Sequence, residues 1–86
     1  MYYCYILQST RNNKYYIGST KNVSDRLKTH NHGRVTSTKC HRPWILKYQE
    51  EYSSLKDARK RERQIKSWHS RKAIERLFSK APSSSG

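Results

Sequence analysis

Two short hydrophobic runs separated by a polar stretch open the chain. The runs cover residues 2–9 and 14–20, and each carries tyrosine and isoleucine in a pattern typical of β-strands. The polar stretch contains the pair Asn12-Asn13, and asparagine is tolerated in tight turns. We therefore predict a β-hairpin with its turn centred on this pair.

The two runs repeat a tyrosine motif, with Tyr5 in the first and Tyr16 in the second. Side chains alternate between the faces of a strand, so the predicted hairpin places both tyrosines on the same face of the sheet. Two phenol hydroxyls would then share one surface. The alternative is that they are ordinary strand aromatics, since aromatic residues favour strands.

An amphipathic stretch follows at residues 22–30 and predicts a short helix with Asn22 as its N-cap. Its hydrophobic positions are four residues apart and should face a core. Arg26 and His30 are also four apart, so they project from the same side, next to the buried stripe. We expect both to point back over the sheet, although each taken singly is typical of a solvated surface.

A longer helix is predicted over residues 54–68, where Ser54 and Asp57 resemble a capping box. One stripe of this helix contains Leu55, Ala58, Glu62 and Ile65. Glu62 thus occupies an apolar-face position, where a carboxylate needs a partner or a metal ion. A salt bridge to a neighbouring cation is one interpretation, and a metal ligand is the other.

The remaining segments complete a single small domain over residues 1–80. A third strand is predicted over residues 44–52, and Ser70 can cap a last helix. Residues 31–42 are expected to form a loop, either contacting substrate or serving as a plain connection. We predict an α/β fold of the α+β type, with a three-stranded antiparallel sheet flanked by about three helices. Residues 81–86 are rich in proline, serine and glycine and are expected to be a disordered tail.

The charge of the chain indicates a nucleic-acid partner. It has 19 Lys and Arg against 6 Asp and Glu, a formal net charge of +13. The chain contains no apolar run approaching ~18 residues, so we predict no membrane association and a cytoplasmic location. The candidate nucleic-acid contacts are basic residues of the turn, the loop and the long helix, namely Lys14, Lys21, Arg34, Lys39, Arg42, Arg59 and Arg63. The alternative is that part of this charge is a solvated helix surface.

The two cysteines do not form a recognisable site. Cys4 lies in the first strand and Cys40 lies beside His41 in the loop. A zinc site needs around four ligands at characteristic spacings. We therefore predict reduced thiols, with neither zinc nor a disulfide.

Several strings in order resemble the GIY-YIG endonuclease superfamily, specifically its small, single-domain, largely uncharacterised bacterial branch. They are the opening Tyr-Tyr-Cys-Tyr-Ile-Leu, then Lys-Tyr-Tyr-Ile-Gly-Ser-Thr, Asp-Arg-Leu-Lys-Thr-His, Arg-Pro-Trp and Arg-Glu-Arg-Gln-Ile-Lys. The resemblance covers about residues 2–78. Aligning Tyr5 with the tyrosine of the first motif keeps the usual separation to Tyr16, and it leaves Tyr3 and Cys4 in place of the motif's glycine and isoleucine.

The resemblance implies a role for each candidate residue. Enzymes of this superfamily cut phosphodiester bonds with one divalent cation, so Glu62 would bind Mg²⁺ or Mn²⁺. Arg26 would neutralise charge on the scissile phosphate. Tyr5 would be the general base toward water, helped by His30, with Tyr16 orienting the water or the phosphate. A nearby cation and Arg26 would favour the phenolate of Tyr5.

The sequence therefore predicts a metal-dependent endonuclease that hydrolyses DNA. We expect the structure of the DNA to direct it more than the base sequence does, with DNA repair as a candidate role. A monomer is the default state. The alternative is a non-catalytic nucleic-acid-binding module that has kept the fold. A carboxylate facing a basic cleft favours the nuclease.

Overall fold

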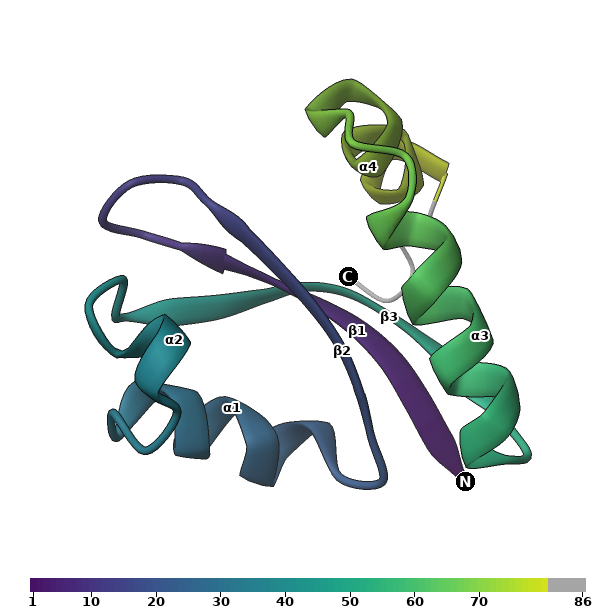
Figure 1. The fold of residues 1–86 in the computed structure, drawn as a ribbon, viewed down its shortest axis with the longest axis horizontal. Helices are drawn as coiled ribbons and strands as arrows, with labels where there is room; N and C mark the ends of the chain where they lie inside the picture. Colours follow the sequence, from purple (N-terminus) through teal and green to yellow (C-terminus); the bar gives the residue numbers. More distant parts are fainter. Residues whose placement is uncertain (81–86) are drawn as a thin grey trace.

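Three strands and four helices make up residues 1–80, the part of the chain that the computed structural model describes (Figure 1). In chain order they are β1 (Tyr2–Ser9), β2 (Tyr15–Thr20), α1 (Val23–Asn31), α2 (Thr36–Lys39), β3 (Trp44–Tyr52), α3 (Leu55–Lys66) and α4 (Arg71–Lys80). The α+β fold with a three-stranded antiparallel sheet is as predicted. The tail predicted to be disordered lies outside the described residues.

The sheet has the order β2-β1-β3, and both pairings are antiparallel. In the hairpin Tyr5 is opposite Gly18 and Tyr16 is opposite Leu7. This register puts Tyr5 and Tyr16 on the same face of the sheet, which confirms that prediction.

The predicted centre of the hairpin turn was wrong by one residue. The backbone N–H of Ser9 donates to the carbonyl of Lys14 at 2.8 Å, so the turn is centred between residues 11 and 12. The hydroxyl of Ser9 accepts from the backbone N–H groups of Arg11 and Asn12, which fixes the first half of the turn. A side chain outside the Asn12-Asn13 pair therefore decides where the chain reverses.

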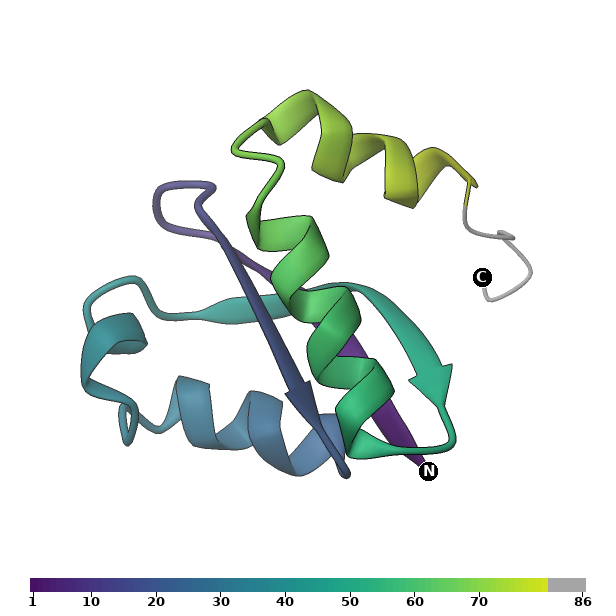
Figure 2. The same ribbon diagram turned by 45° about the vertical axis from the view of Figure 1, so that its right-hand side comes forward.

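Helices cover both faces of the sheet, with α1 and α2 on one face and α3 and α4 on the other (Figures 1 and 2). On the α3 face the core joins Cys4, Ile6 and Ile17 to residues of α3 and α4. On the α1 face the core contains Tyr5, Leu7, Val23 and Trp44. Alternation along β1 thus sends cysteine and isoleucine one way and tyrosine and leucine the other.

Side-chain caps begin the longer helices where the sequence indicates. The side chain of Asn22 accepts from the backbone N–H of Asp25 at the start of α1, and the hydroxyl of Ser54 accepts from that of Asp57 at the start of α3. The hydroxyl of Ser70 accepts from the N–H of Ala73. None of the helices within residues 1–80 is long and apolar enough to cross a bilayer.

The short helix α2 differs from the loop predicted over residues 31–42. Its first turn has no side-chain cap, so local signals for it are weak. It is held by tertiary contacts instead, because the indole Nε1 of Trp44 donates to the carbonyl of Thr38 at 3.0 Å. Asn31 fixes the backbone of Trp44 from the other side, donating to its carbonyl and accepting from its N–H.

Candidate active site

Tyr5 lies in the middle of β1 and is 1% exposed. Its hydroxyl passes directly over Gly18 on the neighbouring strand. A Cβ atom at Gly18 would lie 2.6 Å from the hydroxyl oxygen and 2.8 Å from Cζ of the ring. A glycine is therefore required at position 18 by the close approach of the phenol.

His30 lies near the C-terminal end of α1 and is completely buried. Its Nε2 is 3.4 Å from the hydroxyl of Tyr5, and its Nδ1 is 2.9 Å from the hydroxyl of Thr38. That hydroxyl also donates to the carbonyl of Val35 at 3.3 Å. Because a hydroxyl has one proton, Thr38 then accepts from Nδ1–H, and Nε2 of His30 is left as an acceptor facing Tyr5.

Aromatic rings surround this pair. The ring of Tyr16 has its centroid 4.7 Å from that of His30 and 6.4 Å from that of Tyr5. Trp44 packs edge-on against Tyr16 and lies 6.4 Å from His30. Tyr5, His30 and Trp44 are buried, whereas Tyr16 is only partly buried, so a bound molecule can reach its side chain.

Burial sets the protonation states of the pair. It raises the pKa of Tyr5 to about 12, although the neighbouring Arg26 guanidinium acts in the opposite direction. Burial and the positive charge of Arg26 both lower the pKa of His30. The predicted effect of Arg26 on the phenol is present, but desolvation outweighs it. The chain by itself therefore holds a neutral phenol against a neutral imidazole.

Glu62 lies on α3 and approaches from the other side of the edge strand β2. Its Oε1 accepts from the hydroxyl of Ser19 at 2.7 Å, and its Oε2 accepts from Nζ of Lys66 at 2.6 Å. Ser19 directly follows Gly18, and the charge of Glu62 contributes to the raised pKa of Tyr5. Tyr5, Tyr16, Arg26 and His30 thus form one cluster, and Glu62 lies across β2 within its electrostatic reach.

The donor atoms around Glu62 fit a weakly held hard cation. Within residues 1–80 no three His, Cys, Asp or Glu side chains gather into a cage. One carboxylate, completed by water and by phosphate oxygens, is a common way for proteins to hold Mg²⁺. Lys66 occupies Oε2 through an ion pair, and this lysine must move aside for a cation to bind there.

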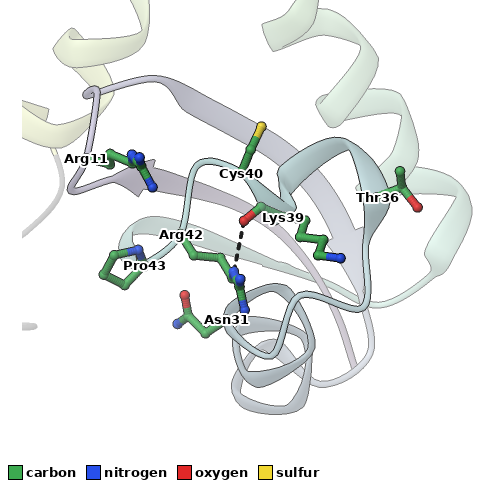
Figure 3. A pocket seen from close by; sticks show the side chains of 7 residues that line it. All are labelled: Arg11, Asn31, Thr36, Lys39, Cys40, Arg42 and Pro43. Carbon is green, nitrogen blue, oxygen red and sulfur yellow. Dashed lines mark hydrogen bonds between the residues drawn. The ribbon is translucent and has the colours of Figure 1, made fainter.

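The predicted nucleic-acid contacts fall on separate surfaces. Arg59 and Arg63 flank Glu62 around a cavity of about 220 Å³. Lys39 and Arg42 line a different cavity of about 490 Å³ beside α2 (Figure 3). The other three are exposed or lie on exposed turns, with Lys14 at the end of the hairpin turn, Lys21 after β2 and Arg34 after α1.

Sequence reasoning missed Thr38, which orients His30, and Ser19, which holds Glu62. Both partners are distant in the chain, eight residues away for Thr38 and 43 for Ser19. The hydroxyl-rich run over residues 36–38 was a signal that polar groups gather there. Nothing in it indicates which hydroxyl meets the imidazole.

Comparison with known proteins gives consistent matches. The model of the GIY-YIG catalytic domain family matches residues 1–75. A UPF0213 protein of Staphylococcus haemolyticus is 43% identical over 68 residues, covering 78% of this chain and 82% of that protein. A UPF0213 protein of Staphylococcus aureus is 40% identical over 60 residues, covering 69% and 73%. The solution structure of a UPF0213 protein from Bacillus halodurans superposes with a TM-score of 0.56 at 31% identity, covering 92% and 84%.

Proposed function

The chain belongs to the GIY-YIG catalytic domain family, a nuclease family, and we propose that it is a divalent-metal-dependent endonuclease that hydrolyses phosphodiester bonds in DNA. The observation that carries the proposal is the buried hydroxyl of Tyr5 facing the acceptor Nε2 of His30. A neutral phenol beside a neutral imidazole can relay a proton without first becoming a phenolate.

In the proposed reaction a water oxygen bonds to the phosphorus as the bond from phosphorus to the 3′ oxygen breaks. The proton of the water passes to the oxygen of Tyr5 while the proton of Tyr5 passes to Nε2 of His30. The high pKa of Tyr5 makes this coupled transfer necessary, and the lowered pKa of His30 keeps its acceptor nitrogen free near neutral pH. The departing 3′ oxygen finally takes a proton from solvent.

The other residues bind and orient the phosphate. Arg26 offers a permanently charged guanidinium beside Tyr5, suited to the extra negative charge of the transition state. The hydroxyl of the partly exposed Tyr16 can orient the water or the phosphate. Glu62 and Ser19 would hold Mg²⁺ or Mn²⁺, which supplies Lewis-acid stabilisation of the leaving oxygen when bound.

Substrate choice in this proposal depends on shape more than on base sequence. The net charge of +13 favours phosphate backbones of any sequence. Branched or nicked DNA arising in repair is the proposed substrate class. Since DNA is the proposed substrate, the cytoplasm is the proposed compartment.

One observation favours a second candidate, a nucleic-acid-binding module without catalysis. Both oxygens of Glu62 already have partners in the chain, and the ion pair with Lys66 satisfies the carboxylate without a cation. In this alternative Glu62 serves the packing of α3 on β2.

Cleavage of labelled single-stranded, duplex and forked DNA with Mg²⁺ or Mn²⁺ separates the two. We expect cutting by the native chain and a loss of about 10²–10⁴-fold in Tyr5→Phe and Glu62→Gln. Glu75→Gln, which changes an acidic residue of α4, is the matched control and should cut normally. Binding must be intact in every variant. Tight binding without cutting on any substrate would instead support the binding module.

A further inference from the structure

The cavity of about 490 Å³ lies where the hairpin turn, the end of α1 and the segment from α2 to β3 meet, and Asn31 in its wall directly follows His30 (Figure 3). Three cations line it, namely Arg11 from the turn, Lys39 from α2 and Arg42 from the segment before β3. Asn31 and Thr36 add polar groups to its wall. Arg11 was not among the predicted nucleic-acid contacts.

The positive charge of this cavity is not compensated by the chain. None of the six acidic residues lines it. Within residues 1–80 the ion pairs involve Arg61, Lys66 and Arg71, which lie on α3 and α4. Cations gathered without a counter-charge repel one another, so a bound anion would stabilise the arrangement.

Arg42 is held in a fixed orientation before any ligand arrives. Its Nε donates to the carbonyl of Lys39 at 2.8 Å, as the dashed line in Figure 3 marks. Its guanidinium packs over Gly33, where a Cβ atom would lie 2.8 Å from Nη1. The two Nη groups remain as a fork, the geometry that suits two oxygens of one phosphate.

The lining also indicates what the anion is. It contains no aromatic side chain on which a base could stack. Charge and hydrogen-bond donors alone recognise a backbone phosphate and carry no base information. We infer that this cavity binds one backbone phosphate of a nucleic acid, at a position on the strand away from the phosphate that is cut. The inference rests on the proposed function, because it takes nucleic acid as the substrate.

The cavity and the catalytic histidine share the helix α2. Thr36 and Lys39 line the cavity, and Thr38 between them contacts Nδ1 of His30. Phosphate binding at this subsite therefore orders the same turn that orients the imidazole.

The test compares the triple variant Arg11→Gln/Lys39→Gln/Arg42→Gln with the native chain. Binding to duplex DNA of several sequences is measured against salt concentration in EDTA, so that cleavage plays no part. We expect the slope of log K against log salt to weaken by about 0.9, the loss of one phosphate contact, equally for every sequence. The charge-matched control Lys56→Gln/Lys60→Gln/Lys72→Gln, on the exposed surface of α3 and α4, should change the slope by less than half as much.

A direct probe is an abasic tetranucleotide followed by amide NMR shifts. Shifts at residues 39–42 that the triple variant abolishes would support the subsite. An unchanged salt slope in a folded triple variant, or equal shifts with an acidic peptide, would overturn it. The two proposals fail separately. If the native chain never cuts DNA but the triple variant has a weaker salt slope, the phosphate subsite stands and the nuclease proposal fails. If the native chain cuts DNA but the triple variant keeps the native salt slope, the nuclease proposal stands and the subsite fails.

Discussion

The two faces of the sheet bury different chemistry. On the α3 face, aliphatic side chains and Cys4 form a core, and the carboxylate of Glu50 is saturated by Tyr48, Tyr52 and two nitrogens of Arg61. On the α1 face Leu7 and Val23 share the core with aromatic rings, and the titratable groups Tyr5 and His30 are buried among them. The α3 face is therefore a core whose carboxylate is paired within the chain, whereas the α1 face buries titratable groups beside the partly exposed Tyr16.

The largest expected effect is on the stability of the α3 face. Ile65→Ala empties a completely buried position and should lower the free energy of unfolding by about 2–5 kcal/mol. Urea denaturation measures it, with the exposed Ile45→Ala as control, expected within about 0.5 kcal/mol of the native chain. Activity per folded molecule should be unchanged, and a selective loss of activity would break the division between the faces.

The Glu50 cluster should give stability that depends on pH. Burial alone would raise the pKa of Glu50, but hydrogen bonds from Tyr48, Tyr52 and Arg61 together lower it. A lowered pKa means that the stabilisation is present above pH 4.5 and is lost as the pH falls through the folded value. Glu50→Gln should cost about 1.5–3 kcal/mol at neutral pH. The difference from the native chain should shrink in acid, whereas the exposed Glu51→Gln should show neither effect.

On the α1 face, Gly18→Ala should displace the phenol of Tyr5 at a cost of about 1–3 kcal/mol. Cleavage should fall with it, because the contact between Tyr5 and His30 is lost. A double variant with Tyr5→Phe tests the cause, since removing the hydroxyl relieves part of the clash. The two costs in unfolding free energy should then sum to more than the cost of the double variant. If the two costs simply add, the strain in Gly18→Ala does not come from the hydroxyl of Tyr5.

The smallest expected effect is a shift in the titration of His30. Arg26→Met removes a positive charge that lowers the pKa of His30, so this pKa should rise while burial continues to hold it down. NMR titration of the imidazole measures the change without any need for activity. Lys28 is an exposed cation on the same helix, and the control Lys28→Met should leave the pKa of His30 unchanged.

Periodicity and capping predicted most of the fold. The strand over Tyr2–Ser9, the caps Asn22 and Ser54, and the shared face of Tyr5 and Tyr16 all follow from local spacing, which the backbone geometry converts directly into position. The same spacing placed Glu62 on a partly buried stripe.

The parts that local spacing missed depend on contacts between distant segments. The turn centre depends on the hydroxyl of Ser9, and α2 depends on Asn31 and Thr38 contacting Trp44. The raised pKa of Tyr5 depends on burial, which a sequence does not show. Whether Glu62 binds a cation or only Lys66 stays a prediction.

The single turn of α2 limits which amino-acid substitutions this protein can accept. Because Thr38 contacts Nδ1 of His30 while Lys39 lines the cationic cavity, a substitution that reshapes α2 changes both places at once. The charge of the cavity can therefore be changed separately at Arg11, which lines it from the hairpin turn and not from α2. Variation among relatives should follow the same route, with the hairpin turn free to diversify while α2 stays fixed.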